Sequence, residues 1–80
     1  MEFNKNDVAD LYKRIGANVK KLRESNGMTQ LTLSLEMGYK SVSLVSSAEL
    51  YAKGKHFNIE HLYKISKIFN VEMSYFFIDD

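Results

Sequence analysis

The chain has 80 residues, 45% of them hydrophobic and 26% charged, with no cysteine and a formal net charge of +1. These values indicate one globular, cytoplasmic domain. They exclude a disordered tail and a disulfide framework, and the balanced charge means that a nucleic-acid surface needs local clustering of basic residues. No apolar run approaches the roughly 20 residues needed to span a bilayer, and the polar N-terminus is unlike a signal peptide, so no membrane partner is expected.

The first predicted element is a long helix that follows a flexible lead-in over residues 1–6. Its apolar residues recur at steps of three and four, which marks one helical face. These residues are Val8, Leu11, Ile15, Val19 and Leu22. Either Asn6 or Asp7 is a suitable N-cap, and Asn26-Gly27 supplies a left-handed stop. We therefore predict one domain over residues 7–78 that begins with this helix.

The stretch from Leu31 to Met37 has a pattern that conflicts with its composition. Apolar residues alternate with polar ones, which by periodicity alone is typical of a half-buried strand. A Thr29 N-cap, a leucine-rich composition and the four-residue step from Leu33 to Met37 favour a helix instead, and a lone strand would have no pairing partner. In a helix, Leu31 and Leu35 cannot both lie on the Leu33–Met37 face. One of them is therefore expected to be partly exposed or to pack against the first helix.

A turn over residues 38–40, with Gly38 at positive φ, separates this helix from a third one. Ser41 is the expected N-cap of the third helix, and Gly54 the expected residue just beyond its end. The residues it is expected to bury are Val45, Ala48 and Ala52.

Two further helices complete the predicted chain. The fourth is capped by Asn58 and ends at Asn70 in the left-handed conformation. Its expected core face consists of Ile59, Leu62, Ile65 or Ser66, and Phe69. The fifth is a short, strongly apolar helix over residues 71–78. The sequence thus predicts an all-α fold of five helices with no repeat and no linker.

Several short motifs point to one family in combination. They are Ile15-Gly16, Leu22-Arg23, Gly27-Met28-Thr29-Gln30, Leu33, Gly38, Val45 with Glu49, and the tail NIEHLYKISKIFNVEMSYFF. Together they resemble the phage-repressor/Cro-type (XRE-like) helix-turn-helix family over residues 12–77. The resemblance implies a compact, lambda-repressor-like domain whose second and third helices form the helix-turn-helix. The chain departs from the family in a longer turn before Ser41, a longer segment after Glu49, and Ser34 at a position where the family usually has alanine.

The resemblance implies that the second helix crosses the DNA backbone while the third enters the major groove. Thr29 and Gln30 then form a helix N-terminus that suits a phosphate, and Gln30 can contact phosphate or brace a neighbour. The start of the third helix would meet base edges, and nearby lysines the backbone. The candidate DNA-binding residues are Thr29, Gln30, Lys40, Ser41, Val42, Ser43, Ser46, Ser47, Lys53 and Lys55.

The base-reading set is weak, because serine discriminates poorly between bases and only Val42 suits a thymine methyl group. No Arg, Asn or Gln occurs between Gly38 and Leu50. The only charge from Met37 to Ala48 is Lys40, so no acid there repels phosphate. We therefore expect modest direct readout, with DNA shape and phosphate contacts contributing more.

Two structural features also follow from the resemblance. Arg23 and Glu49 are expected to form an ion pair that ties the first helix to the third. The C-terminal cluster is too apolar for a monomer's surface, so at least one phenylalanine must be core, and the remainder is predicted to form a homodimer interface. The interface candidates are Met73, Tyr75, Phe76, Phe77 and Ile78.

A metal site is not expected, although His56, Glu60 and His61 lie close together in the sequence. The spacing does not place both histidines on one helical face, and no third ligand has a recognisable interval. No cofactor is predicted either. Without a nucleophile–base pair, a phosphate-cradling glycine loop or a carboxylate constellation, we do not expect an enzyme.

Two functions fit these observations. The first is a sequence-specific DNA-binding transcriptional regulator, a repressor or controller protein, that binds a pseudo-palindromic operator on double-stranded DNA as a homodimer. The alternative is a protein-interaction module on the same fold, such as an antitoxin or anti-repressor, that docks a protein partner through Val42 and Leu44 of the third helix. The weak base-reading set favours this alternative, and salt dependence separates the two.

Overall fold

The computed structural model describes residues 2–79; Met1, the first residue of the expected lead-in, and Asp80 lie outside the described part. Four α-helices and two short 3-10 helices follow one another, with no strand in residues 2–79. They are α1 (Lys5–Ser25), α2 (Gln30–Glu36), α3 (Ser43–Leu50), η1 (Ala52–Gly54), α4 (Ile59–Phe69) and η2 (Met73–Phe77). The all-α class is confirmed, but the predicted count of five helices is not, because the fifth is the 3-10 segment η2.

Helix α1 begins earlier than the sequence suggested. Its N-cap is Asn4, which has an extended backbone and accepts a hydrogen bond from the Asn6 backbone N–H at 2.8 Å. The prediction of Asn6 or Asp7 as the cap was therefore wrong, because the first of three suitable polar residues satisfies the free N–H groups. Residues 5 and 6 of the expected lead-in are helical.

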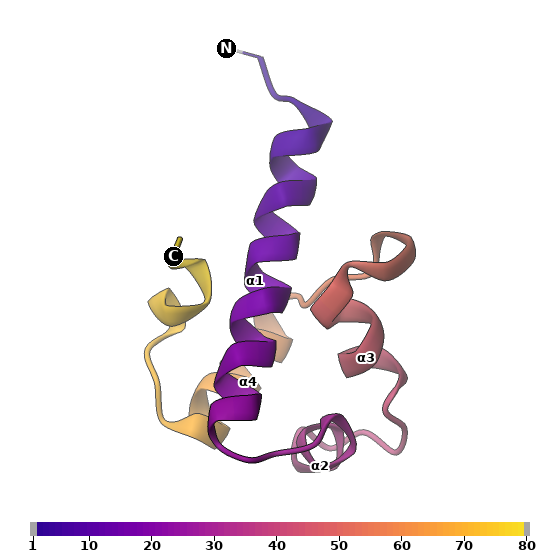
Figure 1. Ribbon diagram of the computed structural model, residues 1–80, viewed down its shortest axis with the longest axis vertical. Coiled ribbons are helices and arrows are strands. Elements are labelled where there is room, and N and C mark those ends of the chain that lie inside the picture. The colour runs from indigo at the N-terminus through magenta and orange to yellow at the C-terminus, as the bar shows by residue number, and fades with distance from the viewer. Residues whose placement is uncertain (1, 80) are drawn as a thin grey trace.

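The apolar face of α1 is buried only in its second half. Ile15, Val19 and Leu22 lie in the core, whereas Val8 is 47% and Leu11 36% exposed. Figure 1 shows the reason: α1 runs through the centre of the molecule, and its N-terminal turns project beyond every other element. The helix ends as predicted, with Gly27 at a φ of +66°.

Segment 30–36 is a helix, which resolves the conflict between pattern and composition. Thr29 is its N-cap, as predicted, and accepts a hydrogen bond from the Thr32 backbone N–H at 3.1 Å. Leu33 is buried, whereas Leu31 and Leu35 are 50% and 55% exposed. Both leucines, rather than one of them, therefore lie at the surface, because a helix of only seven residues presents a single narrow face to the core.

Helix α3 is shorter than predicted at both ends. It starts at Ser43, with Val42 rather than Ser41 as the N-cap residue, and it ends at Leu50. Tyr51 stops it in the left-handed conformation (φ +55°), so Gly54 is not the residue that follows its end. The Tyr51 ring stacks on Tyr12 of α1 with centroids 5.9 Å apart, a tertiary contact that local sequence does not reveal.

The start and end of α4 agree with the prediction. Asn58 forms a full capping box with His61, and Asn70 is left-handed at φ +55°. Leu62 and Ile65 are buried, but Ile59 is 70% exposed, which corrects its assignment to the core. The first turn of α4 lies at the edge of the domain, so its outward position remains in solvent.

The core lies between α1 and the elements packed against it. α3 lies on one side of α1 and η2 on the other, while α2 closes the end of the domain opposite the projecting turns (Figure 1). The largest side chains that are fully buried are Phe57, Phe76, Leu33, Leu62, Ile65, Val19 and Val45. Every element except η1 thus contributes to the core or borders it, and the helix-turn-helix rests on α1.

Candidate nucleic-acid interface

The turn between α2 and α3 is closed by the end of α2 itself. Gly38 has a φ of +97°, as predicted, and its N–H donates to the Leu35 carbonyl at 3.0 Å. The Tyr39 N–H donates to the Ser34 carbonyl at 2.9 Å. This double closure is the Schellman arrangement, which satisfies carbonyls at a helix end and turns the chain sharply. It sets the direction in which the chain leaves α2 for α3.

A buried polar network joins α1, α2 and α3. The Arg23 guanidinium donates to Glu49 from Nε (2.8 Å to Oε2) and from Nη2 (3.1 Å to Oε1). Gln30 Nε2 donates to the same Oε1 at 2.9 Å, and Arg23 Nη1 donates to the Met28 carbonyl at 2.8 Å. The ion-pair side chains are 8% and 0% exposed. The network fixes the end of α3 relative to the start of α2.

The charge states of this network follow from its hydrogen bonds. The side-chain hydrogen bonds to Glu49 raise the pKa of Arg23, and burial of the guanidinium opposes them. A bidentate pair of this kind is strong but depends on both partners, since either one alone would be a buried, unpaired charge. Because Gln30 donates into the pair, its amide nitrogen braces Glu49, one of the two roles expected for it.

The start of α3 is polar and open. Ser41 and Ser43 are exposed, and Ser46 and Ser47, one turn further on, are half-buried. No side chain caps the helix, although Ser41 Oγ accepts the Ser43 N–H at 3.3 Å. Ser46 Oγ donates to the Ser43 carbonyl at 3.2 Å. The hydroxyls at this surface are thus held near the backbone, at the end of α3 opposite Glu49.

Lysines flank α3 at both ends. Lys40 precedes the helix, and Lys53 and Lys55 follow it in and after η1; all three are exposed. Lys53 has a left-handed backbone with a φ of +54°. Cations at both ends of α3 are therefore open to solvent.

A comparison with known families decides the assignment. A model of the helix-turn-helix family matches residues 19–76, which include α2, the turn, α3 and α4. The chain belongs to the XRE-like helix-turn-helix DNA-binding family. The match covers well over half of the chain, and it confirms the resemblance inferred from the motifs. A comparison with curated proteins found no match.

One of the residues predicted at the dimer interface is buried in the core. Phe76, predicted as part of a dimer interface, is 0% exposed and belongs to the core. Its neighbour Phe77 is 42% exposed and Ile78 48% exposed. Because successive residues of η2 point in different directions, one of the two phenylalanines faces inward and the other outward. Met73 and Tyr75 are half-buried and pack against the core.

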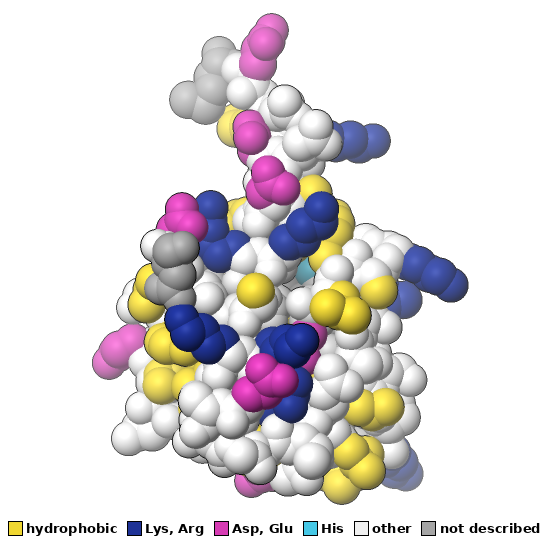
Figure 2. Space-filling view, viewed as in Figure 1, with side chains coloured by type: hydrophobic (Ala, Val, Ile, Leu, Met, Phe, Trp, Pro, Cys, Tyr) yellow, Lys and Arg dark blue, Asp and Glu magenta, His cyan; other side chains and the backbone are white. Residues whose placement is uncertain are grey.

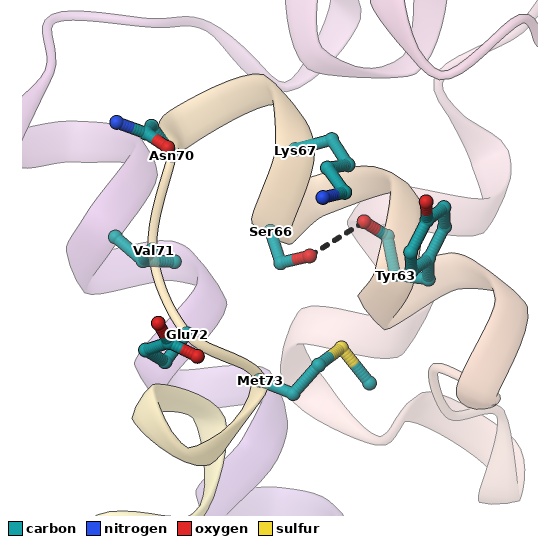
Figure 3. Close-up of a pocket in the computed structure, with 7 residues that line it drawn as sticks. All are labelled: Tyr63, Ser66, Lys67, Asn70, Val71, Glu72 and Met73. Carbon is teal, nitrogen blue, oxygen red and sulfur yellow. Dashed lines mark hydrogen bonds between the residues drawn. The ribbon is translucent and has the colours of Figure 1, made fainter.

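A shallow polar cleft lies beside the end of α4 (Figure 3). It is lined by Tyr63, Ser66, Lys67, Asn70, Val71, Glu72 and Met73. Met73 points across it toward Tyr63, and Ser66 Oγ donates to the Tyr63 carbonyl at 2.6 Å. None of the candidate DNA-binding residues lines this cleft, so it is separate from the helix-turn-helix surface.

The two histidines have structural partners. His56 stacks on Tyr12 with ring centroids 3.7 Å apart, and His61 belongs to the α4 capping box. Within residues 2–79, no group of three or more His, Cys, Asp or Glu side chains could hold a metal ion. In the same part of the chain, no helix is long and apolar enough to cross a membrane.

Asn18 is a key residue that the sequence reasoning missed. It is buried in α1, and its Nδ2 donates to the carbonyls of Phe76 and Ile78, each at 2.9 Å. It thereby ties η2 to α1 across the domain. A signal was available, because Asn18 lies between Ile15 and Leu22 at helical steps of three and four, where a polar residue needs a buried partner.

Proposed function

We propose that this protein is a sequence-specific DNA-binding transcription regulator that places α3 in the major groove of a pseudo-palindromic operator. The observation that carries the proposal is the difference between the two ends of α3. Its Glu49 end is locked to α1 and α2 by buried hydrogen bonds, while its Ser43 end is exposed and free of acidic side chains. A helix that is held firmly at one end and presents a polar, acid-free tip is suited to enter a groove lined by phosphates.

The contacts then fall into two classes. Ser43, with Ser46 and Ser47 one turn on, would face base edges, and Val42 would meet a thymine methyl group. Lys40, Lys53 and Lys55 would contact phosphates on either side of the groove. Since serine reads bases weakly, phosphate contacts and DNA shape supply much of the affinity, which makes binding strongly salt-dependent.

The proposed regulator acts as a homodimer, because two copies related by a two-fold axis match a pseudo-palindrome with half-sites about 34 Å apart. The exposed Phe77 and Ile78 in the C-terminal tail support an interface between copies. The simplest action of such a dimer is to repress transcription by blocking polymerase at the operator.

Docking of a protein partner through α3 has less support. Leu44 packs against the core and Val42 is half-buried, so the two residues expected to dock a partner offer little free apolar surface. The exposed apolar side chain of α3 is Leu50, at the opposite end of the helix. A failure to enrich DNA in the experiment below would favour this function.

The test is selection of genomic DNA fragments by the purified protein at about 50 mM and 200 mM salt. We expect enrichment of a pseudo-palindrome, with an affinity that falls about a thousandfold between the two salt concentrations if about six phosphates are contacted. Ser43→Glu should abolish enrichment, because it places a negative charge at the groove surface. Ala17→Glu is the matched control: it adds the same charge at an exposed site of α1 and should leave binding intact. No enrichment at low salt from the folded protein would contradict the proposal and favour a protein-docking role.

A further inference from the structure

The projecting turns of α1 carry apolar side chains that no other element covers. Val8 and Leu11 are three residues apart, on the same face as the buried Ile15, yet they are 47% and 36% exposed. This face continues the core stripe of α1 into solvent. An apolar helical stripe that leaves its domain is costly unless something packs against it.

Beside these turns lies an apolar groove of about 280 Å³. Its walls include Leu11, Tyr12 and Ile15 of α1, Ile59 and Leu62 of α4, and Phe77 of η2. Ile59 is 70% exposed, Phe77 42% and Ile78 48%, so the apolar surface extends outward from the groove on both sides. Leu11 belongs both to the projecting stripe and to the groove wall, which makes the two surfaces continuous.

Acidic residues of α1, Asp7 and Asp10, are followed by basic ones, Lys13 and Arg14, where the helix enters the domain. Figure 2 shows mostly acidic side chains on the projecting turns, together with one basic side chain, and basic ones just below them. The helix itself begins with an exposed lysine, Lys5. At 3.6 residues per turn, Asp7 and Arg14 lie two turns apart on the same edge of the apolar stripe. Asp10 and Lys13 lie on the opposite side of the helix. Asp7 has no salt bridge within residues 2–79, and Arg14 makes only a long, exposed contact of 3.6 Å to Asp79.

We propose that a second copy of this chain fills the groove, with the two α1 helices packed antiparallel around a two-fold axis. In the register that places Val8 against the partner's Leu11, Asp7 lies beside the partner's Arg14, and both pairings occur twice by symmetry. A second copy fits because one surface supplies both the projecting stripe and the groove, and because the acidic and basic turns complement each other when antiparallel. This inference rests on the homodimer of the proposed function and names its surface.

The apolar part of this surface is tested with Leu11→Glu, by sedimentation equilibrium without DNA. The wild-type protein should be a dimer, and the variant should dimerise about a hundredfold more weakly, because the substitution buries two charges at the centre of the interface. Ala17→Glu, on the solvent side of the same helix, should sediment like the wild type. Circular dichroism checks that both variants remain helical.

The register is tested by exchanging charges. Asp7→Lys and Arg14→Glu should each weaken self-association about tenfold, because each places like charges side by side at both ends of the helix pair. An equimolar mixture of the two variants should form a heterodimer of near wild-type affinity, since both ends regain opposite charges. Asp10→Lys and Lys13→Glu are matched controls that make the same charge changes on the far side of α1 and should have no effect.

A wild-type protein that remains monomeric up to about 100 μM overturns the inference. So does a dimer that Leu11→Glu leaves intact, or a charge-exchanged mixture that fails to associate. These results are independent of DNA. If these variants weaken the dimer as expected but the protein enriches no operator, the proposed regulator is contradicted and this interface is supported. If the protein binds an operator as a dimer that these variants do not weaken, the regulator is supported and this interface is contradicted.

Discussion

The two sides of α3 differ sharply in how far they are buried. On one side Val45, Ala48 and Glu49 are at most 3% exposed and are packed against the rest of the molecule. On the other side Ser43 is exposed and the helix start has no side-chain cap. An eight-residue helix is too short to be stable by itself. The position of its polar start is therefore set by the packing of its buried side.

Removing the carboxylate at the anchored end should have the largest effect. Glu49→Ala leaves the Arg23 guanidinium buried without its ionic partner and deprives the Gln30 amide of its acceptor. The expected loss is about 3–5 kcal/mol of unfolding free energy, a large share of the total stability of a domain of this size. Urea denaturation at 25 °C measures it. Glu36→Ala, which removes an exposed carboxylate from α2, is the control; an equal, small loss in both variants would show that the pair does not anchor α3.

The second-largest loss of stability is expected where α1 closely approaches α3, at Gly16. A Cβ at Gly16 would lie 2.5 Å from the Ala48 carbonyl oxygen and 2.6 Å from that of Glu49. Gly16→Ala should therefore push the helices apart and destabilise the domain by about 1–3 kcal/mol, although alanine is the better helix former by about 1 kcal/mol. Thermal unfolding measures the change. Ala17→Gly, at the next and exposed position, should cost only about 1 kcal/mol, and a stabilised Gly16→Ala variant would contradict the packing described.

A buried serine and an exposed one should respond differently to truncation to alanine. Ser34 is 0% exposed, and its Oγ is the one buried side-chain polar atom without a hydrogen-bond partner in residues 2–79. Ser34→Ala removes this unsatisfied group and should stabilise the domain by about 1 kcal/mol. Ser43→Ala, at the open tip, should change stability by at most about 0.5 kcal/mol but weaken operator binding. Denaturation and DNA titration of both variants check this, and a destabilised Ser34→Ala protein would reveal a partner for the hydroxyl.

Features that depend on neighbouring residues were readable from the sequence. The apolar steps of α1, the Thr29 and Asn58 caps, and the left-handed Gly38 and Asn70 each follow from one or two turns of chain. Features that depend on distant contacts were not. Tyr51 ends α3 while stacked on Tyr12, and Asn18 binds carbonyls 58 and 60 residues away.

In the candidate interface, too, local features were readable from the sequence and long-range contacts were not. The Arg23–Glu49 pair came from the family resemblance rather than from spacing, since the two residues are 26 positions apart. Two roles were open to Gln30. The structure confirms the brace through its hydrogen bond to Glu49, and contact with phosphate stays a prediction. Which of Phe76 and Phe77 faces the core depends on the direction in which η2 docks on α1. Residue types identified these side chains in the sequence, whereas their partners and burial depend on tertiary packing.

The smallest predicted effect concerns the start of α4, which has a side-chain cap where the start of α3 has none. It is a dependence of stability on pH. His61 Nδ1 accepts the Asn58 backbone N–H at 3.0 Å, which requires a neutral ring, and burial lowers the pKa of His61 while Glu60 opposes the shift. The pKa is lower in the folded state than the unfolded value of about 6.5. The unfolded chain therefore takes up its proton first, and this stabilising contribution is complete above about pH 6.5 and is lost as the pH falls through the folded pKa.

Unfolding free energies measured from pH 8 to pH 5 in the wild type, His61→Gln and His56→Gln test this contribution. Glutamine can accept the same hydrogen bond in a capping box but does not titrate. His61→Gln should therefore keep most of the stability at pH 8 and lose less of it on acidification than the wild type. His56→Gln, which leaves the capping box intact, should retain the contribution of His61. If the acid-induced loss were the same in His61→Gln as in the wild type, the cap would not depend on a neutral imidazole, and the Asn58 side chain, which accepts the backbone N–H of residue 61, would cap α4 by itself.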